Sequence, residues 1–181
     1  MTQTVLIKDL KNHVDEEIKI QGWMFNKRSS GKLFFLELRD GTGTVQGIVY
    51  QPDVSPETFA RADELTMETS LEITGKVTKH PKKEDTFELQ VKDIEVIQLV
   101  KEDYPIAKKE HGVDFLLENR HLWLRSSKQR AIQFIRNTII NGIYEYLNNN
   151  GFIKIDSPIL TPNACEGTTE LFEIKYFDEG S

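Results

Sequence analysis

The sequence predicts two structural classes in one chain of 181 residues, an all-β barrel followed by the start of an α+β domain. In the first hundred residues, short runs of alternating apolar and polar side chains are separated by turn residues, which is typical of strands with one buried face. A sustained apolar period of 3.6 residues follows residue 126 and indicates a long amphipathic helix. This order excludes a doubly wound α/β domain, in which helices alternate with strands.

The first part contains five expected strands, over residues 18–25, 33–39, 44–50, 70–77 and 86–97. In the last one the apolar positions change phase, which predicts a β-bulge near Lys92 and Asp93. Between the third and fourth strands, Ser55 as N-cap followed by Pro56 predicts the start of a helix. Five strands with a helix in this place is the layout of the OB-fold, a small Greek-key barrel that binds oligonucleotides or oligosaccharides.

One strand of the hairpin "KLFFLELRDGTGTVQ" departs from alternation, because Phe35 lies among charged residues. Suppose that Arg39 pairs with Thr44 across the turn at residues 40–43. Phe35, Glu37 and Gln46 then share the outer face, since cross-strand partners lie on the same side of a sheet. An aromatic ring beside amide and carboxylate groups suits an unstacked base, which stacks on the ring while the polar groups bind its Watson–Crick edge. Packing of Phe35 beneath a loop or the N-terminal segment is the alternative.

Basic residues gather in two places near this hairpin, although the net charge of the chain is −6 and its pI is about 5.3. Binding to nucleic acid depends on where the cations lie rather than on their sum. The clusters are "NKRSSGK" at 26–32 and "KHPKK" at 79–83, and both are expected in turns. Arg28 and Lys32 of the first cluster could hold phosphates. The alternative for each cluster is a solvated loop.

Several function classes find no support in the sequence. No apolar run approaches the roughly 20 residues needed to span a bilayer, and the N-terminus does not resemble a secretory signal. Cys165 is the only cysteine, so we expect no internal disulfide or thiolate metal site, which fits a cytoplasmic protein. The four histidines are too scattered for a metal site, and no phosphate-binding loop or dinucleotide fingerprint occurs.

The second half of the chain contains the long helix. It should begin with a capping box formed by Ser126 and Gln129 and end at Asn150, with a left-handed cap at Gly151. Before it lies a charged stretch without a sustained period, expected to be a hinge with room for one short helical turn. These patterns divide the chain into a barrel at 1–102, a hinge at 103–127 and an incomplete domain at 128–181.

Two further strands are expected after the helix. Residues 152–157 predict a strand that Pro158 stops, and residues 171–177 predict another. A long helix and one or two strands cannot bury both of their faces alone, so this half is expected to be part of a larger domain.

Three stretches together resemble the class II aminoacyl-tRNA synthetases of the aspartate, asparagine and lysine subgroup. They are "GWMFNKRSSGKLFFLELRDGTGTVQ" at 22–46, "ENRHLWLRS" at 118–126 and "GFIKIDSPILTPNACEGTTELFEIKYF" at 151–177, in the order of the family. The short sequences "RHLWLR" and "EGTTELF" favour the asparagine members of the bacterial type. The resemblance covers nearly the whole chain, which would then be an N-terminal portion of such an enzyme.

The resemblance implies that the barrel binds the anticodon of tRNA(Asn). The family stacks the middle anticodon base, a uridine, on the aromatic residue that matches Phe35 and binds it with the glutamine that matches Gln46. Arg28 matches an arginine that contacts the backbone or a base, and Glu88 is a weaker match to a residue near the first anticodon base. Glu37 belongs to the same cluster and completes the expected anticodon site.

The resemblance also implies roles for the second half. The long helix with "GFIKIDSP" matches the first signature motif of the family, which forms a homodimer interface that would include Ile135, Ile139 and Pro158. The stretch "CEGTTE" matches a mobile loop that closes over the amino acid. Glu166, or in second place Glu170, would contact the ammonium group of the substrate. Judged on the residues alone, both glutamates would be solvated loop acids.

A whole enzyme of this kind makes asparaginyl-adenylate from asparagine and ATP, with Mg2+, and transfers the asparaginyl group to tRNA. The second and third signature motifs, which hold ATP, do not occur in these 181 residues, so we expect no activity and no bound cofactor for this chain alone. Two alternatives stay open. One is an aspartyl-tRNA synthetase, including one that charges both tRNAs; the other is a free-standing OB-fold protein that binds tRNA or single strands.

Overall fold

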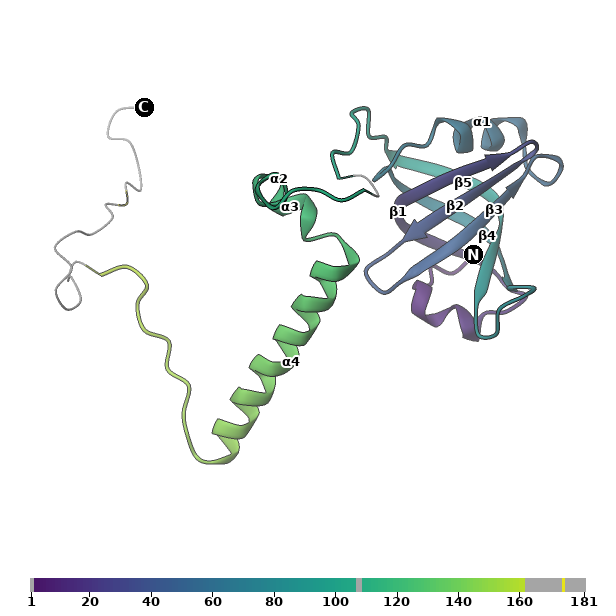
Figure 1. Cartoon of the computed structure of the whole chain (residues 1–181). Coiled ribbons are helices and arrows are strands. Elements are labelled where there is room, and N and C mark those ends of the chain that lie inside the picture. The colour runs from purple at the N-terminus through teal and green to yellow at the C-terminus, as the bar shows by residue number, and fades with distance from the viewer. Residues whose placement is uncertain (1, 107–108, 162–173, 175–181) are drawn as a thin grey trace, which may run out of the picture. The chain divides into compact units, whose positions relative to one another are not determined.

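The chain divides into two compact units, residues 1–110 and 111–181, which are described one at a time. The computed structural model describes residues 2–106, 109–161 and 174. In Figure 1 the first unit contains the strands and the second contains the long helix.

Five strands form a closed barrel in the first unit, which confirms the predicted OB-fold. They are β1 (Glu17–Ser30), β2 (Leu33–Arg39), β3 (Thr44–Tyr50), β4 (Ser70–Lys79) and β5 (Phe87–Gln98). Neighbouring strands follow the order β1-β2-β3-β5-β4, and β1 pairs with β4 to close the ring. Of these pairs, β3 and β5 run parallel and the others antiparallel.

Strand β1 takes part in both sides of the barrel. Its first half, 17–23, pairs with β4, and its second half, 23–30, pairs with β2. A register shift leaves Phe25 as an extra residue, and such a bulge bends a strand. The strand is longer than predicted, because the bulge breaks the alternation and the residues after it are polar. Arg28 therefore lies on a strand and not in the expected turn.

A second bulge lies in β5. The register between β5 and β4 shifts beside Gly75 and leaves Lys92 as the extra residue, which confirms the predicted bulge. The backbones approach closely at this point, since a Cβ on Gly75 would lie 2.5 Å from the carbonyl oxygen of Gln90. Only glycine fits such an approach without a shift of the backbone.

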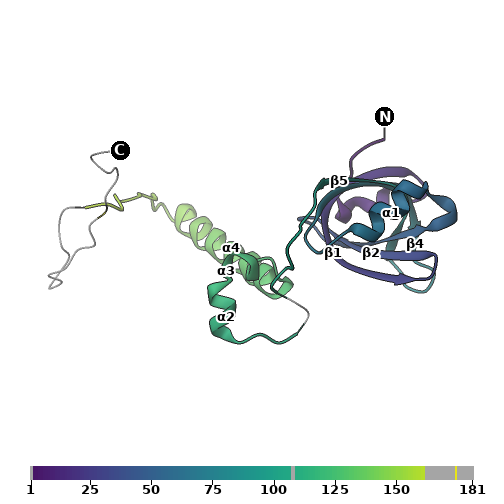
Figure 2. The ribbon, with the colours of Figure 1, turned by 90° about the horizontal axis from the view of Figure 1, so that it is seen from above.

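A helix covers each end of the barrel: α1 (Pro56–Glu64) at one end and the 3-10 helix Ile7–Asn12 at the other (Figure 1). Seen from above, the strands form a ring and α1 lies across it (Figure 2). The hydroxyl oxygen of Ser55 accepts the N–H of Thr58 at 3.1 Å, which confirms the predicted N-cap. The side chain of Ala62 is fully buried in the apolar interior of the barrel.

Asp40 connects the β2–β3 turn to the 3-10 helix. Its Oδ2 accepts the N–H of Ile7 at 2.8 Å, and its Oδ1 accepts the N–H groups of Thr42 at 2.6 Å and Gly43 at 2.9 Å. Burial by itself raises the pKa of this carboxyl, but the hydrogen bonds outweigh burial and hold the pKa of Asp40 below its ordinary value. The turn that joins β2 to β3 is thus fixed by an ionised carboxylate.

The second unit contains three helices in its described part: α2 (Val113–Glu118), α3 (Arg120–Trp123) and α4 (Ser127–Asn149). The stretch 103–127 thus contains more helix than the one short turn that was expected, because α2 and α3 both fall there. None of the helices within the described residues is long and apolar enough to cross a bilayer.

The two ends of α4 differ in how well they match the prediction. At the C-terminal end, Gly151 has a φ of 83°, and the N–H of Phe152 donates to the carbonyl of Leu147 at 3.1 Å. These features confirm the left-handed cap. At its start, Ser126 occupies the N-cap position but makes no side-chain cap bond, and its hydroxyl oxygen is buried without a partner in the described part of the chain. The predicted capping box with Gln129 is wrong, because the backbone of Ser126 is extended as required while its oxygen does not reach the helix N–H groups.

The segment after α4 is not a strand. Residues 152–160 have no ladder partner among the described residues, so the strand predicted at 152–157 is wrong there. An extended segment becomes a strand only when a neighbour pairs with its backbone groups. Ile153 and Ile155 are 86% and 84% exposed. The strand expected at 171–177 lies outside the described residues, apart from residue 174.

Candidate nucleic-acid interface

The register of the β2–β3 hairpin places the predicted residues on one face. Arg39 pairs with Thr44, and Glu37 pairs with Gln46, as the turn predicts. Phe35 pairs with Ile48 and is partly exposed, whereas its neighbours on the opposite face of β2 are buried in the core. Phe35 is therefore part of the outer surface of the barrel.

Arg28 reaches this face from β1. It pairs with Phe35 in the register between β1 and β2, and its guanidinium carbon lies 5.7 Å from the centre of the Phe35 ring. Its Nη2 donates to Oε1 of Gln46 at 3.2 Å. A cation beside an aromatic face and next to an amide can hold a phosphate or a base without moving far. Lys32, the other predicted phosphate contact, is exposed in the turn between β1 and β2.

Glu88 approaches the same face from β5. It lies opposite Gln46 in the parallel register of β3 and β5, and its Oε1 accepts from Nε2 of Gln46 at 2.8 Å. Glu88 is 5% exposed, so its carboxylate is held beneath the surface rather than in solvent. Non-neighbouring segments of the sequence thus meet at Gln46.

His80 also lies near this carboxylate. Its Nδ1 accepts the N–H of Lys82 at 3.1 Å, and its Nε2 lies 3.6 Å from Oε1 of Glu88. Because Nδ1 is an acceptor, the proton of the neutral ring belongs to Nε2, which faces Glu88. The imidazole therefore presents its N–H to the carboxylate.

The predicted residues line a single open cavity of about 450 Å3. Its walls come from β1, β2, β3, β5 and the loop between β4 and β5, and they include the five predicted anticodon residues, Arg28, Phe35, Glu37, Gln46 and Glu88. Phe35 is partly exposed, lines this cavity and does not belong to the buried core of the barrel. A cavity with aromatic side chains and several polar groups matches the needs of an unstacked base.

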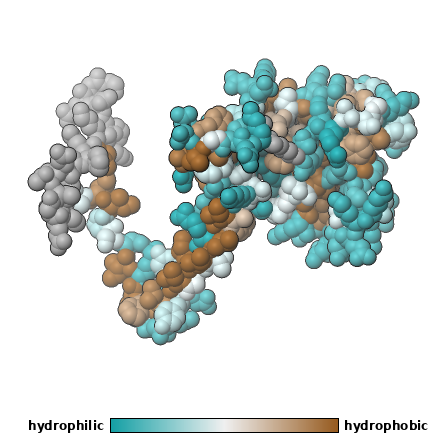
Figure 3. All heavy atoms as spheres, in the orientation of Figure 1, coloured by the Kyte–Doolittle hydropathy of each residue, from teal (hydrophilic) through white to brown (hydrophobic). Residues whose placement is uncertain are grey.

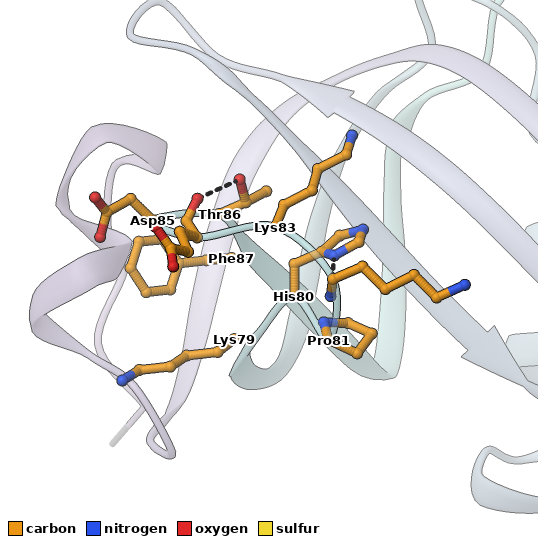
Figure 4. Close-up of a pocket in the computed structure, with 9 residues that line it drawn as sticks. Lys79, His80, Pro81, Lys83, Asp85, Thr86 and Phe87 are labelled. Carbon is orange, nitrogen blue, oxygen red and sulfur yellow. Dashed lines mark hydrogen bonds between the residues drawn. The ribbon is translucent and has the colours of Figure 1, made fainter.

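Sequence reasoning missed the part of the cavity that comes from the β4–β5 loop. His80, Lys83 and Phe87 line it together with the predicted residues. The same loop also encloses a neighbouring hollow of about 530 Å3, in which Lys79 and Lys83 extend away from each other (Figure 4). The basic cluster at 79–83 was a signal for this loop, but the parallel pairing of β3 with β5 that brings it close is not visible in the sequence.

The residues predicted in the second half fall in different situations. Ile135 and Ile139 are 60% and 56% exposed on α4, and apolar side chains run along this helix in Figure 3. Pro158 is exposed in the segment after it. Glu166 and Glu170 lie outside the described residues. Within the described ranges, no group of three histidine, cysteine, aspartate or glutamate side chains could hold a metal ion.

The barrel and its aromatic, amide and guanidinium groups define the class of the first unit, an oligonucleotide-binding OB-fold domain. A family model described as an OB-fold nucleic acid binding domain matches residues 18–97. A second model, described as tRNA synthetases class II (D, K and N), matches residues 112–179. The chain therefore belongs to the class II aminoacyl-tRNA synthetases of the aspartate, lysine and asparagine group.

Solved structures of this group resemble the chain over most of its length. An asparaginyl-tRNA synthetase from Pyrococcus horikoshii, complexed with asparaginyl-adenylate, is 34% identical with a TM-score of 0.84, over 98% of this chain and 42% of that chain. An asparaginyl-tRNA synthetase from Entamoeba histolytica is 27% identical with a TM-score of 0.72, over 99% of this chain and 42% of that one. An aspartyl-tRNA synthetase from Entamoeba histolytica shares the fold, with a TM-score of 0.76 at 24% identity, over 89% of this chain and 40% of that chain. The chain thus spans about two fifths of these synthetases.

Proposed function

We propose that the barrel binds the anticodon of tRNA(Asn) as part of an asparagine–tRNA ligase. The observation that carries the proposal is the cavity in which Phe35, Gln46 and Arg28 meet. Phe35 stacks on the middle anticodon base, Gln46 binds the Watson–Crick edge of that base, and Arg28 holds the adjacent phosphate or base. Glu37 and Glu88 complete the polar wall, and Glu88 also contacts the first anticodon base.

Asparagine is favoured over aspartate by the identities of the relatives. The two asparaginyl-tRNA synthetases are 34% and 27% identical to this chain, whereas the likeness to the aspartyl-tRNA synthetase, at 24%, supports the fold alone. The match of residues 112–179 to a synthetase model argues against a free-standing binding protein, which has no use for that segment. The single cysteine of the chain is consistent with a cytoplasmic setting.

The proposed ligase uses ATP and Mg2+ to form asparaginyl-adenylate before transfer to tRNA. Glu166 and Glu170 are proposed to contact the ammonium group of asparagine. The role of the described residues is recognition, since the barrel presents a base-binding cavity.

Binding of labelled tRNA to the 181-residue chain tests this proposal. Fluorescence anisotropy should show binding of a tRNA with the anticodon GUU that weakens steeply with salt, because phosphate contacts release counterions. A tRNA whose middle anticodon base is changed should bind less well. Equal binding of the two tRNAs would contradict the roles of Phe35 and Gln46.

A variant of Phe35 separates stacking from folding. Phe35→Ala should weaken tRNA binding by about 1–3 kcal/mol, the usual contribution of one stacked base. Tyr146→Ala is the matched control, because Tyr146 is a 68% exposed aromatic residue on α4, outside the barrel. A loss of folding in Phe35→Ala without a separate binding defect would favour a structural role for Phe35.

A further inference from the structure

The side-chain amide of Gln46 is held between two groups of opposite hydrogen-bonding character. On one side, its Nε2 donates to Oε1 of Glu88 at 2.8 Å. On the other side, its Oε1 accepts from Nη2 of Arg28 at 3.2 Å. An ionised carboxylate can only accept hydrogen bonds and a guanidinium can only donate them. A 180° flip of the amide would therefore turn its oxygen toward the carboxylate and its N–H toward the guanidinium, and both hydrogen bonds would be lost.

The two flip states of an amide recognise different bases. After its bonds to Glu88 and Arg28, Gln46 still has one N–H and one oxygen lone pair for a ligand in the cavity. Uracil and guanine present a keto acceptor beside a ring N–H donor, whereas cytosine and adenine present an amino donor beside a ring acceptor. An amide that is fixed in one state complements one of these two patterns and opposes the other.

We propose that Glu88 is a positioning residue that fixes the Gln46 amide in one flip state, so that the cavity selects a keto base over an amino base at Phe35. This inference rests on the proposed function and adds to it the group that orients the base-binding side chain. Glu88 acts through Gln46 and not through a bond of its own to the selected base.

Burial makes Glu88 suited to this role. With 5% exposure and a backbone in the β3–β5 ladder, its carboxylate has little freedom to turn away from Gln46. His80 presents Nε2 to the same Oε1 from 3.6 Å, beyond hydrogen-bond length, so Gln46 is the nearer partner of that oxygen. The charge of Glu88 is balanced on this face by Arg28, one amide away.

The variant Glu88→Gln tests the inference, because it keeps the shape of the side chain but can both donate and accept. We expect wild-type protein to prefer a labelled anticodon stem-loop with the sequence GUU over one with GCU. In Glu88→Gln this preference should fall by about tenfold, chiefly because the GCU stem-loop binds better. A tenfold change corresponds to the free energy of roughly one hydrogen bond. The dissociation constants of the two stem-loops are measured by fluorescence anisotropy at one salt concentration.

Three controls keep the outcomes distinct. Glu84→Gln removes a carboxylate from the β4–β5 loop, and Glu84 lines the neighbouring hollow and not the cavity that contains Gln46, so this variant should leave the preference unchanged. Glu88→Asp keeps the charge but withdraws it from Gln46, so it should also lower the preference for GUU. It replaces Glu88→Gln in the test if that variant does not fold. A third stem-loop, AUU, reports on the first anticodon base.

The results separate the inference from the function on which it rests. If wild-type protein binds GUU and GCU equally, the proposed function fails at Gln46. If wild-type protein discriminates and both Glu88 variants discriminate equally well, Glu88 does not orient the amide and the inference is overturned. A change confined to the AUU comparison would also overturn it, because Glu88 would then affect the first base alone and leave the selection at the middle base unchanged.

Discussion

The barrel and α4 place their apolar side chains in opposite environments. In the barrel, Ile73 is 0% exposed and belongs to a core drawn from all five strands and both covering helices. In α4, Ile139 is 56% exposed, and no residue of the helix is buried. The barrel is thus stabilised by burial within its own residues, whereas the apolar side of α4 is not buried by any of the described residues.

The largest expected effect comes from the same substitution made in both regions. Ile73→Ala should destabilise the barrel by about 2–5 kcal/mol, because it removes buried methylene groups and leaves a cavity. Ile139→Ala should change the stability of the monomer by less than about 0.5 kcal/mol. The measurement is denaturant unfolding followed by Trp23 fluorescence in a Trp123→Phe background. Similar losses in both variants would remove the contrast between the two regions.

A pair of glycines gives the next contrast, with opposite signs. Gly75→Ala should destabilise the barrel by about 1–3 kcal/mol, because the new Cβ would meet the carbonyl of Gln90. Gly142 lies inside α4 with open space around its Cβ position, so Gly142→Ala should stabilise the helix by about 1 kcal/mol. The barrel transition and the helical far-UV circular dichroism signal report the two effects. A destabilising Gly142→Ala would mean that α4 packs closely at this point.

Asp40→Asn tests how the barrel fixes its own turn. We expect a loss of about 1–2 kcal/mol near neutral pH, because an amide cannot accept all the N–H groups that the carboxylate accepts. The pKa of Asp40 is lowered by folding, so its contribution is full above the ordinary value and disappears as the pH falls through the lowered value. The difference between wild type and Asp40→Asn should therefore shrink in acid. A difference that is independent of pH would contradict this account.

The smallest effect on folding is expected from the paired variant Ile135→Ser and Ile139→Ser. Both side chains are exposed, so the barrel transition should move by less than about 0.5 kcal/mol. We propose that α4, with Pro158, forms a homodimer interface. Light scattering should then give a lower average mass for the paired variant than for the wild-type chain. A wild-type chain that stays monomeric at high concentration would contradict the proposed interface.

The barrel was largely predictable because its local signals agree with its tertiary structure. The alternation of β2 and β3 and the turn between them were sufficient to predict that Glu37 lies opposite Gln46 and that Phe35 shares their face of the hairpin. The phase change in β5 was sufficient to predict the bulge at Lys92. In each case the residues that decide the structure are close together in the sequence.

The parts that the sequence did not predict depend on distant residues. His80, Lys83 and Phe87 enter the cavity through the parallel pairing of β3 with β5, which connects segments some forty residues apart, as the bond between Gln46 and Glu88 shows. The second half of β1 was missed because the bulge at Phe25 breaks its alternation. The segment 152–157 has the composition of a strand, but composition does not supply the partner that a strand requires.

The double pairing of β1 also determines when the barrel can form. β1 is made early, yet half of its residues pair with β4, and the Gln46 amide obtains its carboxylate partner from β5. Loop closure over such a distance must precede these contacts, so the hairpin β2–β3 can form first and alone. During synthesis, a nascent chain that ends before β5 carries Phe35 and Gln46 without Glu88, so we expect the complete base-binding surface to assemble only after β5 has been made.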